Sequence, residues 1–171
     1  MKKFLKILVV LVCLFIIYDV WQGKYLNQIW GMLFVKTDPC ALLTQAEIEE
    51  AMGQSVQKVK SGAFGKSKYC TFETQDEPKR ALVVSAIEPD DDYYSGMKVL
   101  ADQEVDGIGD AAFATMIPPK VYVQVRKKNV CLTFEMHQEE PRDVEGKERM
   151  RWRAVREEKT LAPKAVARLE R

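Results

Sequence analysis

Hydrophobic and polar residues follow three successive patterns along the chain, and each pattern predicts a different kind of structure. The first is an apolar run from Ile7 to Tyr18, which comes after the basic residues Lys2 and Lys3. An apolar run behind a basic start is typical of a segment that enters a bilayer and leaves its basic end in the cytoplasm. We therefore predict a membrane segment over residues 1–22 and place the rest of the chain outside the cytoplasm.

This segment has two possible interpretations: a retained membrane anchor and a cleaved signal peptide. Cleavage needs a pair of small residues after the run, and residues 19–24 contain no such pair. Retention is therefore favoured. Residues 4–21 would form about 27 Å of helix at ~1.5 Å per residue, which just crosses a hydrocarbon core of roughly 30 Å. This predicts a single pass through the inner (cytoplasmic) membrane, with the C-terminal domain in the periplasm or an equivalent extracytoplasmic space.

The second pattern, over residues 23–37, is apolar but interrupted by polar residues such as Asn27 and Gln28. Tyr25 and Trp30 suit the membrane–water interface. We expect a juxtamembrane linker or an interfacial helix here. Two further interpretations stay open, in which the segment extends the anchor or packs on the domain that follows.

The third pattern, over residues 38–171, alternates short apolar stretches with turn residues, and its length suits a single domain. Thr44 and Glu47 form a capping box at the start of a helix that Gly53 ends. The other predicted elements are strands over 55–59, 69–73, 81–87, 121–125 and 130–136, a strand from residue 111, a loop over 61–68, and helices over 93–100 and 161–169. Alternation places the following residues of the last two strands on one buried face: Val121, Val123, Val125, Val130, Leu132, Phe134 and Met136. The pairings look like hairpins, so we predict an α+β fold with an antiparallel sheet and helices packed on it, preceded by the transmembrane helix.

Residues 139–159 break this pattern because 14 of the 21 residues are charged, seven of each sign. Such a stretch is solvated rather than core. Alternation around residue 152 suggests a strand, and a charged helix fits almost as well. Basic residues surround a tryptophan here and form a candidate partner-binding site: Arg149, Arg151, Trp152, Arg153 and Arg156. This cluster can hold an acidic partner or anionic headgroups, and a plain solvated face is the simpler interpretation.

The overall charge balance argues against a nucleic-acid partner. With 26 basic and 25 acidic residues the net charge is +1, so the chain has no global field that would attract a polyanion.

Four cysteines bear on the redox chemistry, and Cys13 belongs to the membrane segment. In an oxidising compartment the other three allow one disulfide and one spare thiol. We predict a bridge between Cys40 and Cys70, which would tie the entrance of the domain to its sheet, with Cys131 as the spare. The sequence alone leaves this pairing open.

Several short strings in a fixed order resemble bacterial envelope lipoprotein domains of unknown function. They are DPCALLTQAEI at residues 38–48 with AMG at 51–53, YCTF at 69–72, VDGIGDAAF at 105–113 and the final helix at 161–169. The resemblance implies a compact PsbP-like α+β domain, the same Cys40–Cys70 bridge and no catalytic residues. The chain departs from the family pattern because it lacks a lipobox cysteine and adds the charged stretch at 139–159, where a protein-specific role would lie.

No residue pattern predicts an enzyme. The single histidine, His137, excludes a histidine-based metal cluster, and no G-x-S-x-G motif precedes a serine. Residues 107–112 (GIGDAA) match a dinucleotide motif formally, but a helix precedes them and a strand follows, which indicates a turn. The aspartates at 90–92 can hold a weak cation, and capping of the next helix accounts for them more simply. We therefore predict no catalytic residue, no cofactor and no metal site.

These observations favour a membrane-anchored, extracytoplasmic binding or accessory domain that engages another envelope protein. An inhibitor or immunity protein is one variant of this hypothesis. The alternative is a carrier of a small apolar ligand such as a lipid, and a carboxylate-dependent hydrolase is a weaker third possibility.

Overall fold

A computed structural model describes residues 35–88, 93–117, 119–138 and 144–169. The predicted membrane segment, nearly all of the juxtamembrane stretch and the aspartates at 90–92 lie outside these ranges. Within the described ranges, no helix combines the length and the apolar character of a transmembrane span.

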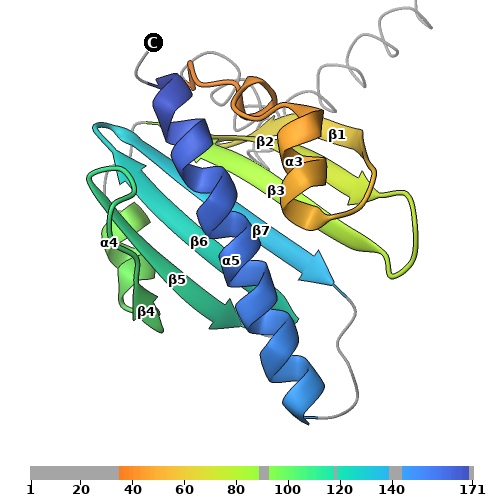
Figure 1. The fold of residues 1–171 in the computed structure, drawn as a ribbon. Helices are drawn as coiled ribbons and strands as arrows, with labels where there is room; N and C mark the ends of the chain where they lie inside the picture. Colours follow the sequence, from red (N-terminus) through yellow and green to blue (C-terminus); the bar gives the residue numbers. More distant parts are fainter. Residues whose placement is uncertain (1–34, 89–92, 118, 139–143, 170–171) are drawn as a thin grey trace, which may run out of the picture.

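The domain is built on one antiparallel sheet of seven strands (Figure 1). The strands are β1 (Val56–Phe64), β2 (Ser67–Thr74), β3 (Arg80–Ile87), β4 (Gln103–Glu104), β5 (Ala111–Ile117), β6 (Lys120–Lys127) and β7 (Val130–Gln138). Their order in the sheet is β1-β2-β3-β7-β6-β5-β4. Short turns join β1 to β2, β5 to β6 and β6 to β7, and the central pairing of β3 with β7 joins the two halves. The predicted α+β class with an antiparallel sheet is confirmed.

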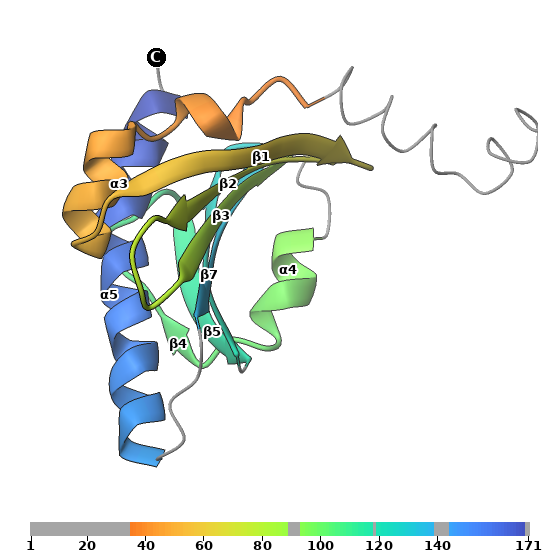
Figure 2. The ribbon, with the colours of Figure 1, turned by 90° about the vertical axis from the view of Figure 1, so that its right-hand side faces the viewer.

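Helices cover the sheet unequally. A short 3-10 helix (Pro39–Ala41) leads into α3 (Gln45–Met52), and the chain ends in the long α5 (Val144–Leu169). Both α3 and α5 lie on one face of the sheet, whereas the short α4 (Tyr93–Lys98) lies on the other (Figure 2). The capping box of Thr44 and Glu47 is present as predicted, and Gly53 ends α3 in the left-handed conformation.

Strict alternation along the strands separates the two faces. On the α5 side, the residues predicted to form the buried face are buried, among them Val123, Val125, Leu132 and Phe134. They pack with residues of the C-terminal half of α5, such as Leu161, into the main core. Burial of this apolar face against α3 and α5 is the main stabilising contribution to the domain.

Two predictions about local structure are wrong. The expected loop over 61–68 is a β-hairpin, in which β1 runs to Phe64 and only Gly65 and Lys66 turn. Gly62 lies within β1 because the ring of its cross-strand partner Tyr69 occupies the space that a Cβ would need. The charged stretch at 139–159 is helical from Val144 onward, so the alternative of a strand is excluded.

One disulfide joins Cys40 to Cys70, with 5.2 Å between their Cα atoms. The predicted pairing is confirmed, and the bridge ties the 3-10 helix to β2. Cys131, the third cysteine of the domain, is buried outside the bridge on the α4 side of β7.

Candidate partner-binding site

The site predicted from the sequence lies on the N-terminal half of α5. This helix starts beyond the ends of the strands and then crosses the sheet (Figures 1 and 2). Its C-terminal half is held by buried residues such as Leu161 and Ala165. Its first turns are largely exposed, and Val144 at the start retains 81 % of its accessible surface. The domain therefore presents the beginning of α5 to solvent.

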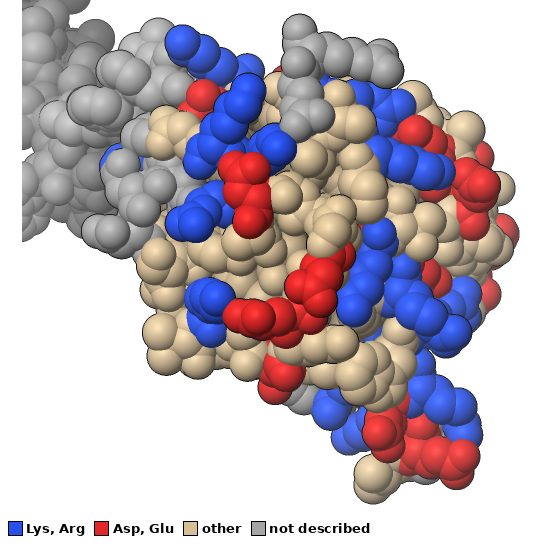
Figure 3. All heavy atoms as spheres, turned by 60° about the vertical axis from the view of Figure 1, so that its left-hand side comes forward, with Lys and Arg blue, Asp and Glu red and all other residues tan. Residues whose placement is uncertain are grey.

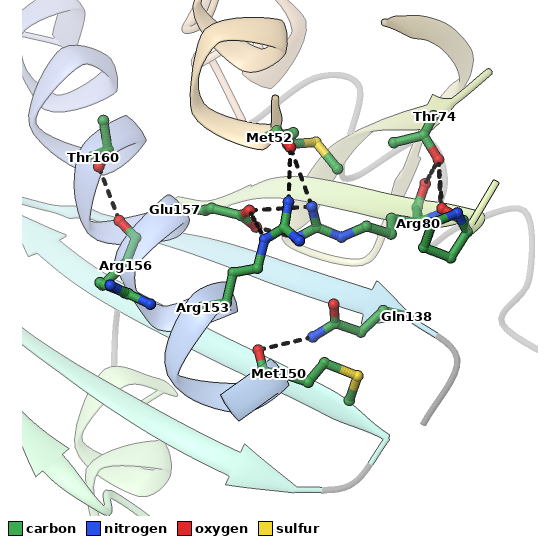
Figure 4. Close-up of polar contacts among 10 residues, drawn as sticks. Met52, Thr74, Arg80, Gln138, Met150, Arg153, Arg156, Glu157 and Thr160 are labelled. Atoms are coloured by element: carbon green, nitrogen blue, oxygen red, sulfur yellow. Dashed lines mark hydrogen bonds and ion pairs between the residues drawn. The ribbon is translucent and has the colours of Figure 1, made fainter. Parts of the chain in front are cut away.

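A buried polar network holds α5 where it reaches the sheet (Figure 4). The guanidinium of Arg80 on β3 donates hydrogen bonds to both carboxylate oxygens of Glu157, and the Nη1–Oε1 distance is 3.1 Å. Arg80 also donates to the carbonyl oxygen of Met52 at the C-terminal end of α3, at 3.4 Å. Because helix C-termini leave their last carbonyls unpaired and carry partial negative charge, a guanidinium is well placed there. The network thus fixes β3, α3 and α5 to one another.

Arg153 belongs to the same network, although its side chain also reaches the surface. Its Nε donates to Oε1 of Glu157 at 2.9 Å, and its Nη2 donates to the Met52 carbonyl at 3.3 Å (Figure 4). The side chain is still about half exposed. The sequence placed Arg153 among the candidate partner-binding residues, and the structure gives it a positioning role in addition.

The outer face of α5 brings together a narrower set of residues. Glu145, Arg149, Trp152 and Arg156 follow one another at steps of four, three and four, which places them on one side of a helix. All four are exposed, and Trp152 retains 43 % of its surface. Arg149 forms an ion pair with Glu145 one turn away. We call Arg149, Trp152 and Arg156 the α5 stripe.

Arg151, the remaining predicted residue, does not join the α5 stripe. It lies about 100° from Trp152 around the helix and is half-buried. Of the five residues predicted from the sequence, three therefore lie on one exposed face of α5. Arg153 hydrogen-bonds within the buried network, and Arg151 lies on a different side of the helix. The periodicity of 3.6 residues decides this division, and it could be applied only once the segment was known to be helical.

An open groove lies at the edge of the sheet where β7 ends. Its volume is about 820 Å³, and it is lined by Glu73, Lys79, Arg80, Ala81, Pro119, His137 and Gln138. Gln138 connects it to α5, because its Nε2 donates to the Met150 carbonyl at 3.3 Å. The groove and the α5 stripe are therefore parts of one end of the molecule.

Sequence analysis missed a charged cluster beside this groove. Oε1 of Glu135 lies 2.6 Å from Nζ of Lys120 and 2.6 Å from Nε2 of His137. The hydrogen bond from Lys120 to the Glu135 carboxylate raises the pKa of Lys120 above its usual value. Residues 135 and 137 alternate onto one face of β7, and the β6–β7 register sets Lys120 opposite His137. Alternation along the strand predicts that residues 135 and 137 share a face. The pairing of Lys120 with His137 depends on the strand register, which only the structure shows.

Two adjacent acids on α5 have different environments. Glu157 is paired with two arginines, as described above. Glu158 is fully buried, and burial, with the neighbouring Glu157 charge adding to it, raises its pKa well above the usual range. The raised pKa means that the folded domain favours the protonated, neutral form of this carboxyl group. Neither acid lines the groove.

Charges of both signs are interspersed over the side of the molecule on which β5 and α4 lie, and on the end that projects from it (Figure 3). From Val144 to Arg156, α5 carries five basic and two acidic residues. The excess of positive charge is confined to these turns of α5, where it favours contact with an acidic or anionic group.

Comparison of the chain with protein-family models, with curated proteins and with solved structures finds no match.

Proposed function

We propose that this protein is a non-enzymatic accessory domain, anchored in the inner membrane and displayed outside the cytoplasm, that binds another envelope protein through the α5 stripe. The observation that carries the proposal is the exposed Trp152, flanked by Arg149 and Arg156, on a helix that starts beyond its own sheet. Tryptophan and arginine are the side chains most often responsible for binding energy at protein interfaces. An inhibitor or immunity protein is one form that this function can take.

The buried network supports this function because it makes the presenting helix rigid. Arg80, Glu157 and Arg153 fix α5 immediately after the exposed turns. A partner that binds a pre-ordered helix does not have to order it, and less binding free energy is lost.

Two features support the proposed compartment. The Cys40–Cys70 disulfide is a bond that persists in oxidising compartments such as the periplasm. The apolar leader of the sequence, residues 4–21, provides a membrane anchor that would place the domain there.

A carrier of an apolar ligand is a less favoured alternative. Such a carrier needs an apolar cavity between the sheet and its helices. Between the sheet and α5 the described side chains fill the layer, with Leu82, Phe134 and Leu161 fully buried. The groove at the strand ends is open and includes charged residues.

The decisive experiment places a photo-crosslinking amino acid at position 152 of the full chain in its native cells. We expect a specific crosslink to one envelope protein. The matched control carries the same amino acid at Val59 of β1, which is comparably exposed at 48 % but lies outside the α5 stripe, and it should give no such crosslink.

Charge reversal then tests the mechanism of recognition. The double change Arg149→Glu and Arg156→Glu should abolish the crosslink from position 152, whereas Lys58→Glu on exposed β1 should leave it intact. Identical crosslinks from positions 152 and 59, or a crosslink that survives the double reversal, would disprove the proposal.

A further inference from the structure

A second charged cavity lies at the other end of the sheet, between α4 and strands β5 and β6. Its volume is about 320 Å³, and it is lined by Tyr94, Ser95, Lys98, Val99, Ala111 and Arg126. This size is at the lower end of the range for small-molecule sites. Both charged residues in the lining are basic.

Arg126 is held rigidly in this cavity by aromatic packing. Its guanidinium carbon lies 5.0 Å from the centre of the Tyr94 ring, in a cation–π arrangement. The Tyr94 ring is itself fixed against Phe113, with 5.0 Å between the ring centres and 60° between the ring planes. Tyr94 is only 3 % exposed. A stacked guanidinium keeps its hydrogen-bond donors free at its edge, so it is pre-organised to hold a ligand.

The donors of Arg126 have no acceptor in the part of the chain that the structure describes. Among the described residues, the carboxylates of Asp110 and Glu104 lie near this cavity, and each is paired with a lysine. Asp110 accepts a hydrogen bond from the Lys128 amide at 2.6 Å and lies 3.2 Å from Nζ of Lys127. Glu104 lies 2.8 Å from Nζ of Lys98, on the exposed rim. Within the described residues, the half-buried guanidinium of Arg126 therefore makes no direct ion pair, although the Asp110 charge acts on it electrostatically.

We propose that this cavity binds a small molecule through a phosphate or carboxylate group, with Arg126 as the main ligand-binding residue. The planar fork of a guanidinium matches two oxygens of such a group. Ser95 on the preceding turn of α4 adds a hydroxyl donor, and Lys98, which is paired with Glu104, lies at the rim of the cavity. The site lies on the α4 side of the sheet and involves no residue of the α5 stripe, so it is independent of the proposed protein partner.

The test is isothermal titration calorimetry on the full chain in detergent micelles at constant ionic strength. Three probes distinguish the sources of the anion: inorganic phosphate, succinate, and a short-chain phosphatidylglycerol for a lipid headgroup. We expect at least one of them to bind. Arg126→Gln should weaken that binding about tenfold or more, and Arg126→Lys should cause a smaller loss, because it keeps the charge but not the planar fork.

Two further variants guard against a change in folding or in general charge. Lys98→Gln alters an exposed side chain and should also weaken binding. Lys128→Gln removes a nearby positive charge at the exposed tip of the same hairpin, outside the cavity, and should leave the affinity unchanged. The proposal is overturned if none of the three probes binds, or if Lys128→Gln weakens binding as much as Arg126→Lys and Lys98→Gln do.

Discussion

Arg80 of β3 and Glu157 of α5 form a buried ion pair between residues that are 77 positions apart in the chain. Their side chains are only 3 % and 8 % exposed. Arg80 also donates a hydrogen bond to the carbonyl oxygen of Met52, the last residue of α3. The contacts of Arg80 thus join the start of β3 to both α3 and α5.

Removal of one partner of this pair should strongly destabilise the domain. Glu157→Ala would leave the Arg80 guanidinium buried without its carboxylate, and we expect a loss of about 3–5 kcal/mol in the free energy of unfolding. Urea unfolding of the full chain in micelles, followed by circular dichroism, measures it. The double variant Arg80→Met with Glu157→Leu should be more stable than Glu157→Ala. Equal stabilities of the two would show that the unpaired charge is not the cause.

The buried acid Glu158 should make the domain less stable as the pH rises. Its pKa in the folded protein is raised above the ordinary value of 4.5. Between 4.5 and that raised pKa, the unfolded chain releases the proton while the folded chain keeps it. The free energy of unfolding therefore falls with rising pH, by up to about 1.4 kcal/mol per pH unit from this group.

Glu158→Gln should remove this dependence. The variant is expected to be more stable than the parent at pH 7, with a difference that shrinks towards pH 4. Unfolding midpoints across pH 4–8 measure the effect, and Glu148→Gln on the exposed part of α5 is the control. A variant whose stability runs parallel to the parent at every pH would refute the assignment.

Glu47 should have the opposite dependence on pH. The hydrogen bond from Arg168, together with those from Thr44, lowers its pKa from 4.5 to about 2. Its contribution to stability is fully present above about pH 4.5 and is lost as the pH falls through about 2. Glu47→Gln should cost about 1–2 kcal/mol at pH 7, and the difference from the parent should fade below pH 4.5. Glu50→Gln on the same helix serves as the control in acid unfolding curves.

Gln124 of β6 is fully buried, and neither its amide nitrogen nor its amide oxygen has a hydrogen-bond partner among the described residues. A buried polar group without a partner costs about 1–3 kcal/mol. Gln124→Met, which is similar in size, should therefore raise the free energy of unfolding by an amount in this range. Thermal unfolding measures the change. A destabilised Gln124→Met variant would indicate that the amide does have a partner, such as a bound water molecule.

Alternation of residues along the strands allowed the sheet to be predicted. The valines of β6 and the apolar residues of β7 face the core as expected, because a strand with one buried face needs a period of two. The hairpin over residues 61–68 was missed, because glycine disfavours strands locally. Packing of the Tyr69 ring against Gly62 reverses that preference, and this contact exists only across the hairpin.

The sequence predicted only part of the candidate site. The composition of residues 149–156 marked a cluster of arginines around Trp152, but it did not separate a strand from a helix. Only the helix shows that Arg149, Trp152 and Arg156 share an exposed side, and that Arg153 contacts Glu157 and Met52.

The sequence by itself determined the elements whose causes are local: the capping box at Thr44, the alternation of the central strands, the apolar leader, and the presence of only three cysteines outside it. Tertiary structure decided which distant residues meet. The order of the strands, the Arg80–Glu157 pair and the cavity around Arg126 all depend on strand register and on helix packing. These arise from burial of whole faces, which depends on apolar area and not on any one residue, so no short stretch of sequence specifies them.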